Sequence, residues 1–332
     1  MFNKLIRNAC ALVALAAAAA AVSSQAQPAA APAFPSKPVK IIVAAAAGSS
    51  PDGIARKLAT KLTAAWSQPV LIENVVGLGG ITGTERASKQ PADGYTLLVS
   101  TIGAMAVGSS LMDKMPYDPV KDLDSVSLLM VMPNLMVVHP SVPATNLREL
   151  IAYAKQNPGK LRYGHPGVGT TPHLSAELLN QMAGLKLQGI PYKSSAQMMI
   201  DLLAGHYEVL FHNSSVVLPH AQAGKARILG ITSSARIATL PDIPTVAEVG
   251  GLPGFAISAW FGLYAPAGTP PELVAKVSAD IAAALSQPDV KSWIETQGGT
   301  VGGGTPQALA FFQAAETKKW RDMIKSANIK AD

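Results

Sequence analysis

Two stretches of small and hydroxyl-bearing residues each connect a short apolar run to a helix-like run. The first reads AAAAGSSPD, from Ala44 to Asp52, and the second reads GHPGVGTTPH, from Gly164 to His173. Small residues let a ligand approach the backbone closely, and the amides at a helix start carry a partial positive charge. These stretches therefore favour binding of a carboxylate or another small anion.

Strand ends near these stretches add further candidate contacts. Thr101 and Gly103 follow a predicted strand at 96–100, while His165 and His212 each follow a predicted strand later in the chain. Asp52 has an alternative interpretation, because it could simply cap its helix and, as an anion, would repel an anionic ligand. The candidate ligand-binding residues are Ala46, Gly48, Ser49, Ser50, Asp52, Thr101, Gly103, His165, Gly167, Gly169, Thr170, Thr171 and His212.

The sequence carries no pattern typical of a metal, cofactor or nucleophile site. No His-Glu-x-x-His occurs among the six histidines, so we expect no metal. The stretch 77–83 fails the dinucleotide-binding spacing because position 82 is a threonine, so we interpret it as a glycine-rich turn and expect no cofactor. No Gly-x-Ser-x-Gly elbow occurs either, so we identify no catalytic residue.

Strand-like and helix-like runs alternate along most of the chain, which predicts an α/β fold with parallel or mixed sheets flanked by helices. Apolar residues recur every four positions from Ile54 to Trp66, as on the buried stripe of a helix. The other predicted helices are 147–156, 171–182, 196–204, 271–286 and 306–325. The predicted strands are 41–44, 70–73, 96–100, 126–138 with a break at Pro133, 161–163, 185–190, 209–211, 228–231 and 255–264.

Two long extended segments, 126–138 and 255–264, predict how the chain divides into domains. One segment would leave the first domain and the other would return to it. The first domain would then be discontinuous, comprising 34–128 and 257–332, with 129–256 inserted as the second. Two domains joined in this way can hinge, and we expect the ligand in the cleft between them.

The N-terminus has the features of a secretory signal. Lys4 and Arg7 precede an apolar run, and small residues at Ser24 and Ala26 fit a cleavage site, so we predict a signal peptide at 1–26 and a flexible lead-in at 27–33. A membrane anchor is the alternative, but the run is shorter than the ~20 residues that a span needs. We therefore expect a periplasmic protein.

Composition narrows the function further. Cys10 is the only cysteine and lies inside the predicted signal, so the mature chain would have no disulfide, thiolate metal site or cysteine nucleophile. The formal net charge of +6 is mild, and the basic residues are scattered. Nucleic acid is therefore not expected as a partner, whereas a small anionic ligand is compatible with this charge.

Several short motifs occur in an order and at separations that are specific as a set. They are FPSKPVKIIV at 34–43, DGYTLL at 93–98, PYDPVKD at 116–122, VVHPSV at 137–142, PYK at 191–193, LPH at 218–220, LPDIPTV at 240–246 and WFG at 260–262. Through them the mature chain resembles, nearly end to end, the periplasmic solute receptors of tripartite tricarboxylate transporters, also called Bug-type receptors.

The resemblance implies a two-lobed periplasmic binding protein of the type II-like class rather than an enzyme. Such a receptor closes on a small di- or tricarboxylate and delivers it to the inner-membrane permease subunits of its transporter, and we expect a monomer. In the family, the loops that match 44–52 and 164–173 contact the ligand, often through backbone amides and bridging waters.

Two departures from the family pattern concern the ligand. The first loop is usually rich in proline and glycine, whereas here it reads AAAAGSS from Ala44 to Ser50. The position after Phe211, commonly an aspartate, is His212. We hypothesise a dianionic ligand, with an aromatic dicarboxylate as one candidate, rather than an amino acid whose ammonium group would need the aspartate.

Two other classes of function stay open at this point. A periplasmic enzyme could act on a small carboxylate with His165 or His212 as general base. An interaction protein without any small ligand is the third interpretation.

Overall fold

The computed structural model describes residues 34–193 and 195–327. The predicted signal peptide, 1–26, and the predicted lead-in, 27–33, lie outside these ranges. Lys37–Asp332 forms one compact unit, and the helices and strands described below belong to it. Within the described part of the chain, no helix combines the length and the apolar character that crossing a membrane requires.

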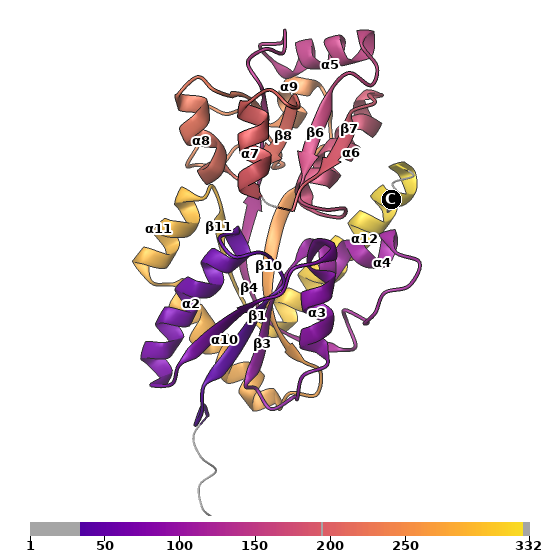
Figure 1. Ribbon diagram of the computed structural model, residues 1–332. Helices are drawn as coiled ribbons and strands as arrows, with labels where there is room; N and C mark the ends of the chain where they lie inside the picture. Colours follow the sequence, from indigo (N-terminus) through magenta and orange to yellow (C-terminus); the bar gives the residue numbers. More distant parts are fainter. Residues whose placement is uncertain (1–33, 194, 328–332) are drawn as a thin grey trace, which may run out of the picture. The chain divides into compact units, whose positions relative to one another are not determined.

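The first sheet has six strands in the order β11-β4-β10-β3-β1-β2 (Figure 1). Parallel pairs join β1 to β2 and to β3, whereas β10 is antiparallel to β3 and β4, and β11 is antiparallel to β4. The sheet is therefore mixed. Its strands are β1 (Val39–Val43), β2 (Val70–Asn74), β3 (Thr96–Thr101), β4 (Leu123–Pro133), β10 (Ser258–Pro266) and β11 (Thr300–Gly303).

The second sheet has five strands in the order β7-β6-β8-β5-β9. Here β6 is parallel to β7 and β8, and β5 is antiparallel to β8 and β9. Its strands are β5 (Leu135–Val138), β6 (Arg162–His165), β7 (Gln188–Pro191), β8 (Val209–His212) and β9 (Arg227–Ile231). The predicted α/β class with mixed sheets is thus confirmed, and β6 and β8 extend to His165 and His212, which the sequence had placed just past the strands.

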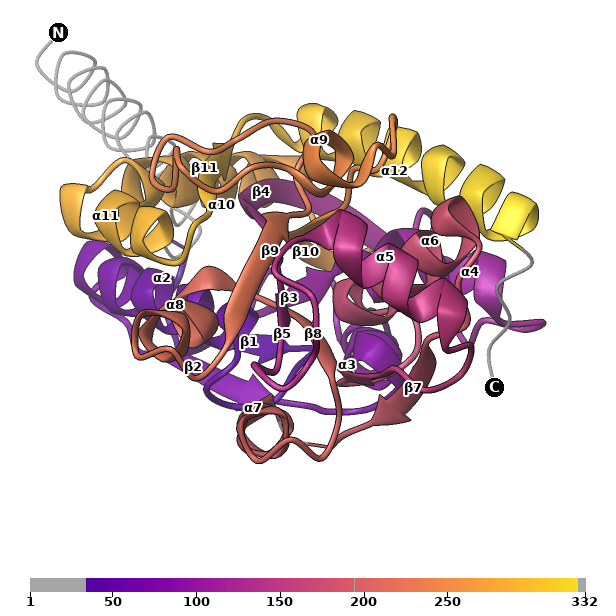
Figure 2. The same ribbon diagram turned by 90° about the horizontal axis from the view of Figure 1, so that it is seen from above.

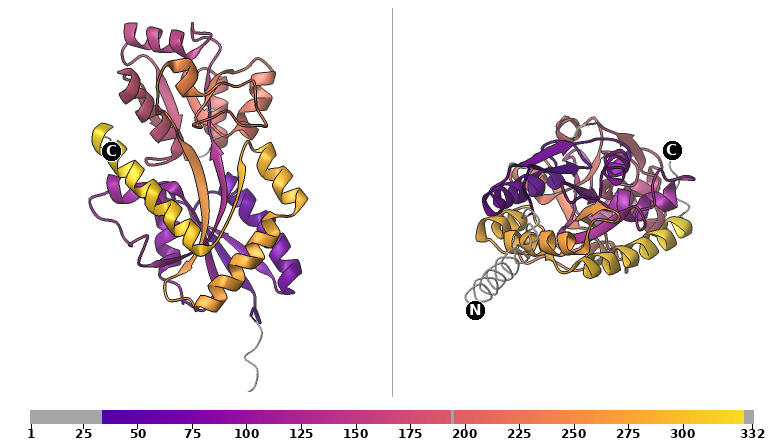
Figure 3. Two further views of the ribbon diagram at one scale, coloured as in Figure 1. Left: turned by 180° about the vertical axis from the view of Figure 1, so that it is seen from behind. Right: turned by 90° about the horizontal axis from the view of Figure 1, so that it is seen from below.

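Helices flank both sheets. Helices α10 and α12 pack on β4 of the first sheet (Figure 3), and α5 lies beside α9 (Figure 2). The helices are α2 (Ser50–Trp66), α3 (Ile81–Ser88), α4 (Gly108–Leu111), α5 (Leu147–Gln156), α6 (Thr171–Ala183), α7 (Ser195–Leu203), α8 (Ser214–Gln222), α9 (Val246–Gly250), α10 (Pro271–Leu285), α11 (Pro288–Thr296) and α12 (Pro306–Ala327), with a 3-10 turn η1 (Leu78–Gly80) and a π turn η2 (Gly103–Val107).

The core explains why these elements form where they do. On α2, Ile54, Leu58 and Leu62 are buried as their four-residue spacing predicts. The final helix is fixed by polar contacts as well as apolar ones, because Trp260 and Trp320 both donate from Nε1 to Glu316 Oε2, at 3.3 and 3.0 Å. Helices α3, α4, α8, α9 and α11 and strand β11 were not predicted, since each is short and lacks a sustained period. Helix α3 begins at Ile81, inside the stretch 77–83 that the sequence predicted to be a turn.

The chain passes between the two sheets twice, and both passages meet at one buried threonine. The first is Asn134, the single residue between β4 and β5, and the second is Ile257, just before β10. Thr232 Oγ1 accepts from Asn134 N at 2.8 Å and donates to Ile257 O at 2.8 Å. Its backbone N–H donates to Asn134 O at 2.9 Å, and its carbonyl accepts from Ile257 N at 2.8 Å.

The predicted domain division into 34–128 with 257–332 and 129–256 is compatible with these passages. Compactness alone does not separate two such domains within Lys37–Asp332. The division therefore stays a prediction about which parts of the unit move together.

We predict that Thr232→Val lowers the free energy of unfolding by about 1–3 kcal/mol, because it leaves Asn134 N and Ile257 O buried without the hydroxyl. Thr232→Ser keeps the hydroxyl and serves as the matched control. Urea denaturation of both variants measures the difference. Equal stability of the valine and serine variants would contradict this account of the passages.

Candidate functional site

The two predicted ligand loops have the same hydrogen-bond pattern, residue for residue. In the first, Ser49 Oγ donates to Ala46 O at 2.5 Å, and in the second Thr170 Oγ1 donates to Gly167 O at 2.6 Å. The backbone N–H of each hydroxyl residue points to the same carbonyl, at 3.2 and 3.4 Å. A glycine with positive φ precedes the hydroxyl residue in both loops, with φ of +78° at Gly48 and +79° at position 169.

This pattern turns both cap hydroxyls away from the helices that they precede. An N-cap side chain usually accepts from an amide of the first turn, but within the described residues neither Ser49 nor Thr170 does so. Pro51 and Pro172 occupy the first turn without an N–H of their own. The remaining amides at these helix starts are thus available to an anion.

Both helix starts border one cavity of about 630 Å³. Residues at the carboxyl ends of β1 and β3 form one side, and residues around the starts of α6 and α8 form the other. Most of the predicted site residues line this cavity. They are Ala46, Gly48, Ser49, Ser50, Thr101, Gly103, Thr170, Thr171 and His212.

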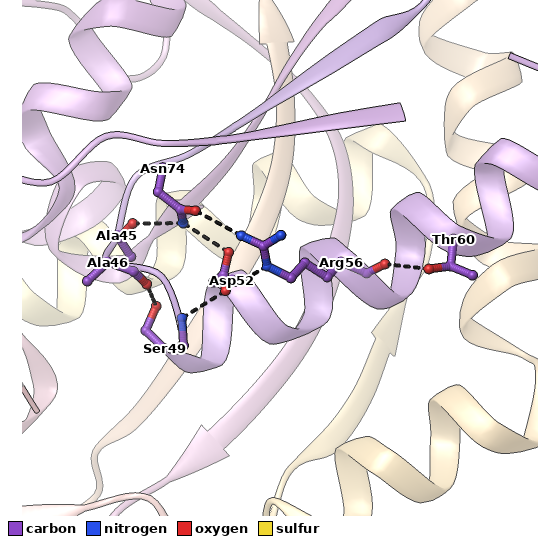
Figure 4. A network of polar contacts seen from close by, with 8 residues as sticks. Ala45, Ala46, Ser49, Asp52, Arg56, Thr60 and Asn74 are labelled. Carbon is purple, nitrogen blue, oxygen red and sulfur yellow. Dashed lines mark hydrogen bonds and ion pairs between the residues drawn. The ribbon is translucent and has the colours of Figure 1, made fainter. Parts of the chain in front are cut away.

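Asp52 does not line the cavity but lies behind the first loop (Figure 4). Its carboxylate, 3% exposed, accepts from Gly48 N at 2.8 Å, Arg56 Nε at 3.0 Å and Asn74 Nδ2 at 3.0 Å. Burial alone would raise the pKa of Asp52, but the hydrogen bonds and the charge of Arg56 outweigh it and lower the pKa. Since Asn74 also donates to Ala45 O, Asp52 belongs to a network that fixes the loop.

His165 also supports a loop rather than lining the cavity. Its buried ring packs 5.6 Å from the ring of Tyr163 and 5.0 Å from that of His173, and its Nδ1 accepts from Gly167 N at 3.3 Å. Gly167 and Gly169 likewise lie outside the lining and shape the backbone, with φ of +140° and +79°.

Backbones from the two sides of the cavity approach each other at Gly103. A methyl group added at this glycine would lie 2.9 Å from Gly79 O and 3.2 Å from Gly169 O. Only glycine therefore fits this contact without a shift of either loop.

His212 lies at the end of β8 and contacts its neighbour Asn213. The ring Nδ1 accepts from Asn213 N at 2.9 Å and also contacts the side-chain oxygen of Asn213. Burial lowers the pKa of His212, and the contact with Asn213 opposes this effect only in part, so the ring is neutral at neutral pH. Asn213 Nδ2 in turn donates to Ser50 Oγ at 2.6 Å, which links the second sheet to the start of α2.

Charge in the cavity favours an anion. Among the described lining residues there is no aspartate or glutamate, and Lys193 is the single lysine. Tyr192 OH donates to Asp201 Oδ2 at 2.8 Å, and burial together with this aspartate raises the pKa of Tyr192 to about 12. The phenol thus stays neutral and adds no negative charge to the cavity.

The sequence reasoning missed a group of lining residues. The turn from Val76 to Gly80 follows β2, whose carboxyl end lies at the same edge as those of its parallel neighbours β1 and β3, so its position carried a usable signal. Asn134 and Phe261 required the strand pairing, which no local pattern reveals. Among the described residues, no cluster of histidine, aspartate or glutamate fits a metal ion.

Two sheets joined by two passages, with a cavity bordered by loops from both, define a solute-binding protein of the two-lobed periplasmic class. Residues 54–329 match the family described as "Tripartite tricarboxylate transporter family receptor". The chain belongs to this family. The relative BugT of Bordetella pertussis is 37% identical over 295 residues, which cover 89% of this chain and 90% of BugT.

Solved structures agree with this membership. R. palustris Rpa4515 with adipate has a TM-score of 0.84 at 35% identity, covering 90% of this chain and 99% of that one. The periplasmic binding protein BugD has a TM-score of 0.82 at 30% identity, covering 90% and 99%. MatC from Rhodopseudomonas palustris with bound malate has a TM-score of 0.81 at 32% identity, covering 88% and 100%. The family resemblance drawn from the motifs is confirmed.

We predict that Asp52→Asn lowers the free energy of unfolding by about 1–3 kcal/mol at pH 7, since Arg56 and Gly48 N lose a charged acceptor. The pKa of Asp52 is lowered in the folded state, so its contribution is present above the ordinary value of 3.8 and is lost as pH falls through the folded-state pKa. The difference between wild type and variant should therefore shrink below pH 4.

Urea denaturation from pH 7 to pH 3 measures this difference. Asp113→Asn is the control, because Asp113 is exposed and the same change there should leave stability within about 0.5 kcal/mol of wild type. A difference between wild type and Asp52→Asn that stays constant across this range would rule out the acid-linked network.

Proposed function

We propose that this protein is a periplasmic receptor that captures a small dicarboxylate or tricarboxylate in the cavity and delivers it to a permease of the tripartite tricarboxylate class. The proposal rests on the pair of matched helix starts, which border one cavity. The described residues that line this cavity include no acidic side chain. Each helix start offers amides with a partial positive charge, so the pair suits a ligand with two anionic ends.

The size and lining of the cavity support this ligand class. A volume of about 630 Å³ lies within the range of small-molecule sites. Apolar side chains, including Met132, Val216 and Phe261, cover part of the wall and suit an aliphatic or aromatic spacer. The bound adipate and malate of the two R. palustris proteins are dicarboxylates and support the proposal by similarity.

Hydrogen bonds alone can supply the affinity. A hydrogen bond to a charged group contributes about 1.5–3 kcal/mol. Four or five such bonds, less the costs of association and desolvation, reach the ~8 kcal/mol that corresponds to micromolar binding. No arginine in the cavity is needed for this affinity.

Domain closure would complete the site. One proposed moving part comprises 34–128 together with 257–332, and the other comprises 129–256. The hinge between them would lie at the two passages that Thr232 joins. Side-chain hydrogen bonds already connect these parts. They include Asn213 Nδ2 to Ser50 Oγ, Ser214 Oγ to Gln297 O at 2.5 Å and Gln181 Nε2 to Ser326 Oγ at 3.3 Å. Export through the predicted signal and action as a monomer are part of the same proposal.

Thermal-shift measurements on the mature chain test this function. The panel comprises mono-, di-, tri- and aromatic carboxylates, and each incubated sample is also analysed for conversion. A bound ligand at a hundredfold its Kd stabilises the fold by about 2.7 kcal/mol, which for a chain of this size raises Tm by roughly 4 °C. Stabilisation without conversion is expected.

The other outcomes would reject the proposal. Conversion of a carboxylate would select the enzyme interpretation, in which His212 is the histidine that lines the cavity. No shift across the whole panel would select an interaction protein without a small ligand.

We predict that His212→Asp weakens binding of the dianionic ligand about tenfold or more, because the substitution brings a like charge into the cavity. Isothermal titration at pH 8 gives the affinity. His139→Asp, the same change just past the end of β5 that lies away from His212 and outside the lining, should bind as wild type does. A His212→Asp variant with unchanged affinity would count against a dianionic ligand near this ring.

A further inference from the structure

Asn134 has a buried side chain in the cavity lining, and its amide nitrogen has no hydrogen-bond partner within the described residues. The residue is 5% exposed and lines the cavity. Its backbone groups are bonded, but its Nδ2 has no hydrogen-bond partner among the described residues. Buried amide donors are almost always paired in folded proteins, so this one calls for a partner from outside the chain.

The surroundings of Asn134 hold its position. Both of its backbone groups are bonded to Thr232, with Asn134 N donating at 2.8 Å and Asn134 O accepting at 2.9 Å. It follows Met132 by two positions on the same strand path, so both side chains can lie on one face, and Ala259 pairs with Met132 from β10. We call Met132, Asn134, Ala259 and Phe261, which all line the cavity, the cavity floor.

Strand order separates the cavity floor from the two helix starts. In the first sheet β4 lies three strands from β1, and in the second sheet β5 lies two strands from β6. At about 4.8 Å per strand, Asn134 lies roughly 10–14 Å from the carboxyl ends of β1 and β6. One carboxylate, whose oxygens are close together, cannot contact a helix start and Asn134 at the same time.

We propose that Asn134 is a specificity-determining residue whose side-chain amide donates a hydrogen bond to the second polar end of the bound ligand. A ligand with one carboxylate at the helix starts and a hydrogen-bond acceptor at its far end satisfies this donor. A ligand with a methyl group at that end leaves the donor buried and unpaired, which sites of this kind reject. The cavity therefore selects dicarboxylates over monocarboxylates of the same length.

This inference rests on the proposed function and sharpens its ligand class. It also links the ligand to the passage between the sheets. Asn134, which would bind the second polar end of the ligand, is also the residue that joins β4 to β5. Contact with the ligand would thus stabilise one defined geometry of the passage.

Matched ligand pairs test the proposal by isothermal titration. The pairs are adipate with hexanoate and benzene-1,4-dicarboxylate with 4-methylbenzoate, in which a methyl group replaces one carboxylate. Wild type should prefer the dicarboxylate of the pair that fits. Asn134→Leu, similar in shape but without a donor, should bind that dicarboxylate about ten- to hundredfold more weakly and the monocarboxylate equally or better.

Two further variants keep the test decisive. Gln222→Leu also removes a side-chain amide, but at an exposed position outside the cavity lining, and it should retain the preference of wild type. Asn134→Ala replaces the leucine variant if that protein does not fold, and a thermal melt checks folding of each.

The outcomes separate this inference from the proposed function. A preference ratio that is the same in wild type and in the Asn134 variants overturns the role of Asn134 and leaves the receptor function standing. If folded wild type binds none of the carboxylates of either the pairs or the wider panel, the receptor function fails and the role of Asn134 fails with it.

Discussion

The site depends on two hydroxyl groups that donate to carbonyls earlier in the chain instead of accepting from amides of the helices that follow. Ser49 and Thr170 each donate to a carbonyl three residues earlier, so neither caps the helix that it precedes. A helix start without its own cap keeps amides with unmet hydrogen-bonding capacity and a partial positive charge. Two such starts on one cavity favour an anion through backbone amides, and Lys193 is the single lysine among the described lining residues.

A buried carboxylate behind an anion-binding loop needs compensation, and Asp52 shows how this is achieved. Arg56 balances its charge, while Gly48 and Asn74 supply hydrogen bonds, so the charge is satisfied within the protein. The same contacts hold the glycine whose positive φ turns the loop. The equivalent helix position in the second loop is His173, so only one of the two loops uses this arrangement.

The sequence was sufficient for the fold class, most elements and the positions of the two loops that border the cavity, because those features are local. Helix α5 begins and ends at the predicted residues, and the cap hydroxyls lie in the predicted loops. The sequence was not sufficient to place the side chains of Asp52 and His165. Whether such a side chain faces a cavity or supports a loop depends on packing. Asn134 could not be identified from its neighbours in sequence, since its importance arises only when β4 and β5 join different sheets.

The four hydrogen bonds of Thr232 have a consequence for motion. Because both connecting segments are fastened to the same residue, neither can lengthen or slip independently of the other. Rotation about a common axis is then the movement with the least disruption, and the two connections would bend in step.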